Sequence, residues 1–221
     1  MLAAPRIVFM GTPEFAVPSL RALLDGGCRV AAVYTQPDRP AGRGREAAAS
    51  PVKRLAVELG IEVLQPRSLR EPEALARLAG LAPDLIVVVA YGLLLPASVL
   101  GLPRYGCLNV HPSLLPRHRG PSPIPWAILD GDAVTGVTMM LMDEGMDTGP
   151  ILEQVEEPVR DDDTALSLSR RLAALAAALL PRTVGRWARG EIKPQPQDDA
   201  RASYSRLITK ADGQIDWRLP A

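Results

Sequence analysis

Short apolar runs alternate with amphipathic stretches along the first half of the chain. The runs Ile7–Met10, Arg29–Thr35, Ile61–Leu64 and Asp84–Ala90 have the length and apolar content of buried strands. The stretches between them have helical spacing and end at glycines such as Gly60. Strands that alternate with helices predict an α/β fold of the Rossmann-like, doubly wound type, with a mostly parallel sheet and helices on both faces.

The second half continues the pattern with three further strands, Gly106–Val110, Thr135–Met142 and Ile151–Val155. The last connection is too short for a crossover helix, so the last strand is expected to run antiparallel to its predecessor. A Leu- and Ala-rich helix follows and reaches Leu180. From Glu191 onward Pro, Gln and Asp dominate the composition. We therefore expect residues 1–190 to form one domain, large enough to be a catalytic domain, and residues 191–221 to be a linker or a surface-wrapping tail.

Composition narrows the classes of function. Of the 221 residues, 47% are hydrophobic, and 25 basic residues balance 25 acidic ones, so a polyanionic partner would need a local basic patch. The two cysteines, Cys28 and Cys107, lack metal-ligand spacing and predict reduced thiols in a cytoplasmic protein. No apolar run has the length of a membrane span. The turn after Met10 lacks the G-x-G-x-x-G spacing of dinucleotide-binding folds.

Two polar residues interrupt the strand that begins at Gly106. Side chains alternate along a strand, so Asn109 and His111 point to the same face, where the strand ends. Ligands of open parallel sheets bind at this edge. An amide donor beside a titratable imidazole suits acyl-type transfer, because one stabilises a developing oxyanion and the other moves a proton. The alternative is that His111 is only a structural hydrogen-bonding residue.

A third candidate, Asp147, lies in a loop flanked by Gly145 and Gly149. Near His111, its carboxylate would favour the imidazolium and fix the orientation of the ring. The alternative is that Asp147 and its acidic neighbours Asp143 and Glu144 simply form a turn.

The segment Gln36–Ser50 is a long loop that carries Arg39, Arg43 and Arg45. Arginines on a glycine-containing loop suit contacts with a phosphate backbone. An ordinary solvated linker is the alternative.

Several longer motifs resemble one family. They are FMGTPEFAVPSL, TQPDRPAGRGRE, VVVAYGLLLP, LNVHPSLLPRHRGPSPI and GVTMMLMDEGMDTGPIL. Together they resemble the methionyl-tRNA formyltransferases, within the wider group of folate-dependent formyltransferases, and the resemblance runs from Ile7 to Trp217.

The resemblance implies a formyltransferase fold and a reaction between 10-formyltetrahydrofolate and initiator methionyl-tRNA, with no metal and no membrane, in a monomer. It also implies site residues by position. The catalytic trio would be Asn109, His111 and Asp147. The loop that contacts folate would be Ser113, Leu114, Leu115 and Pro116, and the segments Val89–Leu95 and Met142–Asp147 would line the pterin pocket. The residues that contact the tRNA would be Arg39, Arg43 and Arg45.

Two departures from the family pattern bear on these expectations. His118 stands where the family usually carries an aromatic residue. Family members continue into a small C-terminal β-barrel that helps bind tRNA, so residues 191–221 are expected to be a linker toward a domain this chain lacks. Two alternatives therefore remain, a formyltransferase for a small amine, such as an amino sugar or glycinamide ribonucleotide, and a catalytically weak binding fragment.

Overall fold

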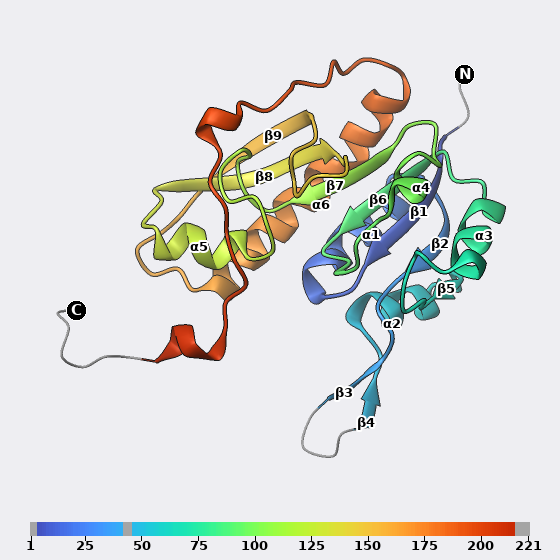
Figure 1. The fold of residues 1–221 in the computed structure, drawn as a ribbon, viewed down its shortest axis with the longest axis horizontal. Coiled ribbons are helices and arrows are strands. Elements are labelled where there is room, and N and C mark those ends of the chain that lie inside the picture. Colours follow the sequence, from blue (N-terminus) through green and yellow to red (C-terminus); the bar gives the residue numbers. More distant parts are fainter. Residues whose placement is uncertain (1–3, 42–45, 215–221) are drawn as a thin grey trace.

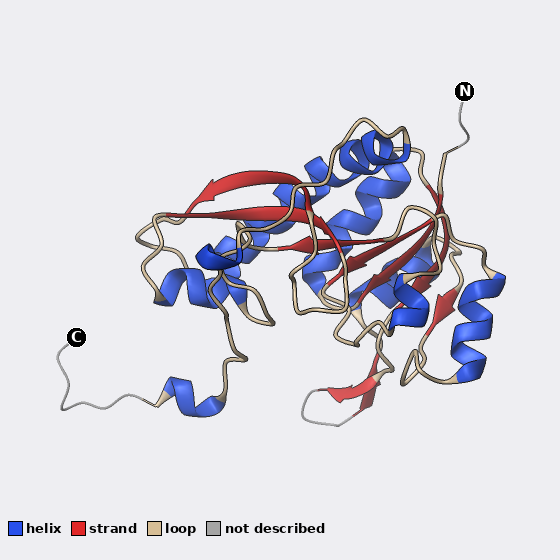
Figure 2. Cartoon of the chain, turned by 45° about the horizontal axis from the view of Figure 1, so that its top comes forward, coloured by secondary structure: helices blue, strands red, loops and turns tan. Residues whose placement is uncertain are grey.

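The protein, described here by a computed structural model covering residues 4–41 and 46–214, is built on one twisted sheet with helices on both faces (Figures 1 and 2). The sheet has seven strands in the order β5-β2-β1-β6-β7-β8-β9. Their bounds are β1 Arg6–Gly11, β2 Arg29–Tyr34, β5 Val63–Leu64, β6 Leu85–Val89, β7 Cys107–His111, β8 Val134–Leu141 and β9 Ile151–Pro158. The predicted doubly wound α/β fold is confirmed.

Strand direction changes at one end of the sheet. The strands from β5 to β7 are parallel, whereas β8 runs antiparallel to both β7 and β9. The predicted antiparallel arrangement of the last strand and its predecessor is therefore confirmed. The reversal of β8 relative to β7 was not anticipated.

The helices divide between the two faces of the sheet. The helical elements are η1 Glu14–Ala16, α1 Val17–Asp25, α2 Pro51–Glu58, α3 Pro72–Gly80, α4 Ala97–Leu100, α5 Pro123–Leu129, α6 Ala165–Ala188, η2 Asp199–Arg201 and η3 Lys210–Gly213. Buried residues of α1, α2 and α6 form one apolar core against the sheet, and those of α3 and α4 form a second core on the opposite face.

Alternation along β7 decides which face carries the candidate chemistry. Leu108 and Val110 belong to the core beneath α6, so Cys107, Asn109 and His111 face the other way. Burial of these apolar residues fixes the register of the strand, because a slip by one position would bury Asn109 in place of Leu108.

A small antiparallel ribbon projects from the body of the molecule. It consists of β3 Arg39–Ala41 and β4 Glu46–Ala48, separate from the main sheet (Figure 1). The sequence predicted only a long loop here. Arg39 lies in β3, whereas Arg43 and Arg45 fall outside the described residues.

The segment after α6 packs along the body. We call Gln195–Arg206 the C-terminal strap. Main-chain hydrogen bonds join Gln195 to Ile151 of β9, and others join Ser203 and Ser205 to Arg119. The strap thus takes the surface-wrapping course that was one of the two expectations for this region. Its role as a linker toward a further domain stays a prediction.

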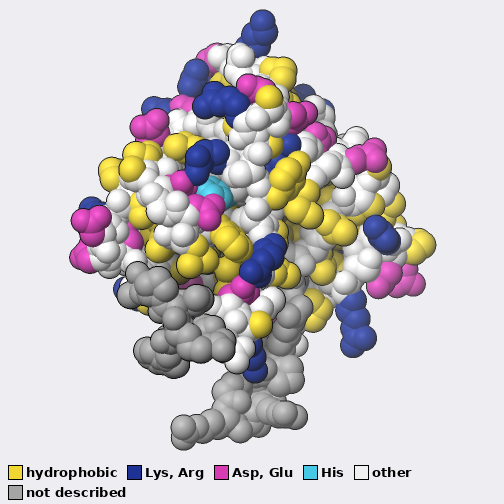
Figure 3. Space-filling model, turned by 60° about the vertical axis from the view of Figure 1, so that its left-hand side comes forward, with side chains coloured by type: hydrophobic (Ala, Val, Ile, Leu, Met, Phe, Trp, Pro, Cys, Tyr) yellow, Lys and Arg dark blue, Asp and Glu magenta, His cyan; other side chains and the backbone are white. Residues whose placement is uncertain are grey.

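The surface drawn in Figure 3 carries hydrophobic side chains among charged ones of both signs. This mixture agrees with the equal numbers of basic and acidic residues. Among residues 4–41 and 46–214, no helix combines the length and the apolar character that crossing a membrane requires.

Candidate active site

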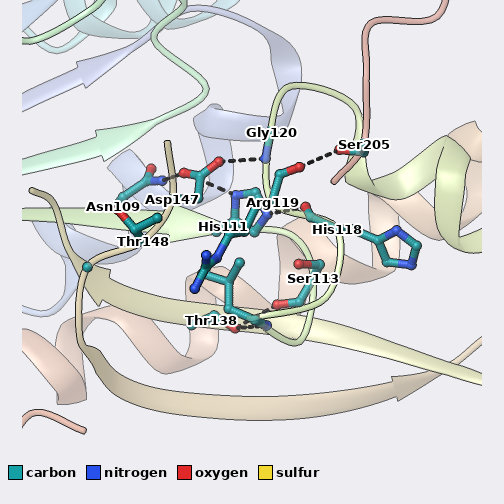
Figure 4. Close-up of polar contacts among 12 residues, drawn as sticks. Asn109, His111, Ser113, His118, Arg119, Gly120, Thr138, Asp147, Thr148 and Ser205 are labelled. Atoms are coloured by element: carbon teal, nitrogen blue, oxygen red, sulfur yellow. Dashed lines mark hydrogen bonds and ion pairs between the residues drawn. The ribbon is translucent and has the colours of Figure 1, made fainter. Parts of the chain in front are cut away.

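Two segments that are distant in sequence bring the three candidate side chains together (Figure 4). Strand β7 supplies Asn109 and His111, and the β8–β9 loop supplies Asp147. The amide Nδ2 of Asn109 donates to Oδ1 of Asp147 at 3.3 Å, and the same oxygen lies 3.6 Å from Nδ1 of His111. The three groups predicted to converge do so, while their catalytic roles stay a prediction.

The Asp147 carboxylate is held on two sides. Its second oxygen, Oδ2, accepts a hydrogen bond from the main-chain N–H of Gly120 at 2.8 Å. The residue itself adopts a left-handed backbone conformation, with φ of 55°. Such a conformation is uncommon outside glycine and is tolerated best by Asn and Asp, whose short polar side chains form local hydrogen bonds.

The His111 ring has a defined tautomer. Its Nε2 lies 2.9 Å from the main-chain oxygen of His118. A carbonyl oxygen only accepts hydrogen bonds, so Nε2 carries the proton and Nδ1 of the neutral ring holds the lone pair beside Asp147.

The environment keeps this ring neutral at rest. Burial lowers the pKa of His111 below its ordinary value, against the opposing effects of the Asp147 charge and of the bond to His118. The side chain of His111 is 5% exposed and that of Asp147 is 18% exposed. A neutral Nδ1 can therefore accept a proton, and the imidazolium formed would lie against a carboxylate.

His118 contributes through its backbone as well as its ring. Its imidazole is 3% exposed, and its Nε2 lies 2.6 Å from Oδ2 of Asp132. Its carbonyl is the group that holds His111. The sequence could not show this, because any residue type supplies a carbonyl oxygen and the chain direction decides where it points.

Hydrogen bonds within the loop and to strand β9 hold the loop that is predicted to contact folate. Ser113 is fully buried, and its hydroxyl donates to the Arg117 carbonyl at 2.6 Å. Gln154 of β9 donates to the carbonyl of Leu115 at 2.9 Å. Residues of this loop line a cavity of about 580 Å³. The lining residues are Leu114, Leu115, Pro116, Arg117, Gln154, Glu156 and Arg201. None of Asn109, His111 and Asp147 lines it, so a role of residues 113–116 in folate binding stays a prediction.

A second cavity, of about 330 Å³, lies at the base of the ribbon. It is lined by Thr12, Pro13, Gln36, Pro37, Ala48, Ala49, Ser50 and Pro51, at the carboxyl ends of β1 and β2. The hydroxyl of Thr12 donates to the carbonyl of Tyr91 at 2.9 Å, which joins this region to the turn after β6. In the part of the chain that the structure describes, no group of three His, Cys, Asp or Glu residues could hold a metal ion.

Comparisons with known proteins show the family of the chain. The family model described as "Formyl transferase" matches residues 5–184. The chain is 55% identical over 216 residues to the methionyl-tRNA formyltransferase of Stutzerimonas stutzeri strain A1501, an alignment that covers 98% of this chain and 69% of that protein.

Solved structures share the fold. Glycinamide ribonucleotide transformylase 1 from Symbiobacterium toebii superposes with a TM-score of 0.72 at 27% identity, over 88% of this chain and 95% of that one. An N-formyltransferase from Helicobacter canadensis, solved with folinic acid and dTDP-3-aminofucose, gives a TM-score of 0.66 at 18% identity, over 94% of this chain and 72% of that one. Because the family model matches residues 5–184 and a relative is 55% identical across 98% of this chain, the chain belongs to the formyl transferase family.

Proposed function

We propose that this protein transfers a formyl group from 10-formyltetrahydrofolate to the α-amino group of initiator methionyl-tRNA. The observation that carries the proposal is the convergence of Asn109 and His111 on the Asp147 carboxylate, at 3.3 and 3.6 Å. It occurs in a chain whose sequence is 55% identical to a methionyl-tRNA formyltransferase.

Each member of the trio has one task. Nδ1 of His111 accepts the proton that the attacking amine loses, a role that contributes about 10²–10⁴-fold to a rate. One N–H of Asn109 holds Asp147, and its second N–H donates to the formyl oxygen as negative charge develops there, which contributes roughly 3 kcal/mol. Asp147 stabilises the imidazolium and orients both neighbours.

The folate would supply the formyl group on a nitrogen that serves as the leaving group. As the bond between this nitrogen and the formyl carbon breaks, the nitrogen would take up the proton that His111 accepted. The residues that would hold it are the turn after β6 and the β8–β9 loop. Val88 of β6 pairs with Asn109, so this turn follows β6 beside the end of β7. Both segments present apolar surface, since Leu94 is 79% exposed and Met146 is 59% exposed. Apolar walls with main-chain hydrogen-bonding groups suit a pterin.

We assign the acceptor end of the tRNA to the segment Gln36–Ser50, which includes the ribbon. Three arginines of this segment, Arg39, Arg43 and Arg45, would contact phosphates of the acceptor end, as basic loops do. Because the surface in Figure 3 mixes both signs of charge, a local cluster is the better candidate for the polyanion.

The assay that tests the function supplies 10-formyltetrahydrofolate with charged initiator tRNA, glycinamide ribonucleotide or an amino-sugar nucleotide. We expect transfer to the tRNA. Transfer to a small amine alone would reject the tRNA assignment, and folate binding without any transfer would reject catalysis. His111→Ala should abolish transfer while folate affinity, measured by calorimetry, stays within about threefold.

A further inference from the structure

The C-terminal strap reaches the candidate active site through one buried cation, Arg119. The side chain of Arg119 is 2% exposed, although it comes from the loop that follows β7. Its main-chain N–H donates to the carbonyl of Ser203 at 2.9 Å, and its carbonyl accepts from the N–H of Ser205 at 2.7 Å. The strap therefore lies directly beside the loop that carries His118, Arg119 and Gly120.

The guanidinium is bonded almost entirely by the strap. Its Nε and Nη2 donate to Oε1 of Gln197 at 3.0 and 2.9 Å, and Nη2 also donates to Asp199 at 2.7 Å. Its Nη1 donates to the hydroxyl of Tyr204 at 3.3 Å. A buried cation must be paired and hydrogen-bonded, so these strap residues account for the burial of Arg119.

Gln197 connects this cation to the catalytic loop. Its Oε1 accepts from Arg119, while its Nε2 donates to the carbonyl oxygens of Asp147 at 2.8 Å and Gly149 at 2.7 Å. A single side chain thus bonds Arg119 on one side and the main chain of the carboxylate residue on the other.

Both Gln197 and the residue that follows Arg119 form hydrogen bonds with Asp147. Gly120, the residue after Arg119, donates its N–H to Oδ2 of Asp147. The carbonyl of Asp147 itself is held by Gln197. The backbone of Asp147 is in the left-handed conformation, which persists only where its surroundings hold it.

We propose that Gln197 and Arg119 are positioning residues of the transfer reaction, which hold the Asp147 carboxylate at its distance from His111 and Asn109. Gln197 is then a part of the active site, although it lies beyond residues 5–184 that the family model matches. This inference rests on the proposed function. Misplacing a reacting group by about 1 Å can cost about 100-fold in rate, so a side chain that never touches substrate can control turnover.

The contacts with Asp199 and Tyr204 are less suited to this task. The side chain of Asp199 is 83% exposed, and exposed ion pairs contribute little. Gln197 is the strap residue that bonds the catalytic loop directly, and it is the one to replace.

The primary variant is Gln197→Met, which keeps the length of the side chain and removes its donors and acceptor. Gln195→Met is the matched control, because Gln195 lies on the same strap and its amide donates only locally, to the carbonyl of Lys193. We expect kcat of Gln197→Met to fall about 10- to 100-fold, with KM for folate and for tRNA within about threefold of wild type. The control should keep its kcat, and the urea midpoints of both variants show whether each is folded.

Gln197→Glu separates the two halves of the bridge. It keeps an acceptor for Arg119 and lacks donors for the two carbonyl oxygens. A kcat as low as that of Gln197→Met assigns the effect to the hold on the Asp147 loop, whereas wild-type kcat in both variants would overturn the proposal.

A readout independent of turnover is the titration of the imidazoles by NMR. The chain contains two histidines, so the His111 signal is one of two to be assigned. The charged and titratable groups that influence the pKa of His111 are Asp147 and His118. If the carboxylate moves away in Gln197→Met, the pKa of His111 falls, because the Asp147 charge raises it in the wild-type protein. An unchanged pKa of His111 together with an unchanged kcat would overturn the positioning role. Wild-type protein that fails to transfer formyl while the variant still shifts His111 would instead reject the proposed function alone.

Discussion

Replacing Asp147 with asparagine removes a charge and preserves shape. The substituted side chain keeps an oxygen for the Gly120 N–H, so the loop retains that contact. The amide nitrogen then stands where Oδ1 was, so the bond accepted from Asn109 is lost. Also lost is the attraction between the carboxylate and the imidazolium that forms at His111, across the 3.6 Å separating Oδ1 from Nδ1.

The size of the loss follows from that distance. Unit charges about 3.6 Å apart interact by about 4–5 kcal/mol at an effective dielectric constant of about 20. Because Asp147 is partly exposed, solvent reduces this value, and we expect about 2–3 kcal/mol to remain. At about 1.4 kcal/mol per factor of ten, kcat of Asp147→Asn should fall about 30- to 150-fold.

The pH profile carries the sharper test. His111 must be neutral to accept a proton, so kcat rises as pH increases through the pKa of His111 in the enzyme–substrate complex. The carboxylate raises that pKa, and its removal lowers it. The acid limb of Asp147→Asn should therefore move to lower pH.

The measurement is kcat at saturating folate and tRNA between about pH 5 and 8. Glu144→Gln, an exposed carboxylate in the same loop, is the control and should leave the profile in place. A kcat within threefold of wild type, or an acid limb displaced to higher pH, would refute the assigned roles of Asp147 and His111.

Three further predictions concern the scaffold. Gly136→Ala should lower the free energy of unfolding by about 1–3 kcal/mol in urea titrations, because the added Cβ would overlap the carbonyl oxygen of Val155. The control is Gly80→Ala, which should not destabilise the protein because the space around Gly80 is open. Ellman's reagent should leave Cys107 unmodified until the chain unfolds, because burial raises the pKa of this thiol to about 12, while half-buried Cys28 reacts first. Hydrogen bonds from Arg171 hold the pKa of the Asp163 carboxyl below its usual range in the folded state. Asp163→Asn should therefore lower the free energy of unfolding at neutral pH, and the difference from wild type should shrink as pH falls below about 4.

The sequence predicts those parts of the site that depend on strand alternation. Asn109 and His111 share a face because Leu108 and Val110 must be buried, and this follows from a five-residue pattern. The fold class follows in the same way from apolar runs separated by amphipathic stretches. The proximity of Asp147 could be expected only through the resemblance, since its own loop reads equally well as a turn.

The remaining features depend on main-chain groups and on long-range contacts. The carbonyl of His118 and the N–H of Gly120 position the trio, and no residue type encodes either of them. Gln197 lies 50 residues from Asp147, in a segment whose Pro- and Gln-rich composition is typical of a linker. The ribbon of β3 and β4 was missed because its strands are too short to show a period.

The reversed direction of β8 explains why the carboxylate needs so much support. His111 ends β7 opposite Thr138, but β8 then runs away from it and ends at Leu141, opposite Leu108. The β8–β9 loop therefore starts at the far end of β7 and must fold back to bring Asp147 near His111. Gly149 permits this return, since a Cβ there would overlap the carbonyl oxygen of Leu141. A carboxylate on a parallel strand would be positioned by the strand itself, whereas this one lies on a doubled-back loop and depends on bonds from its neighbours.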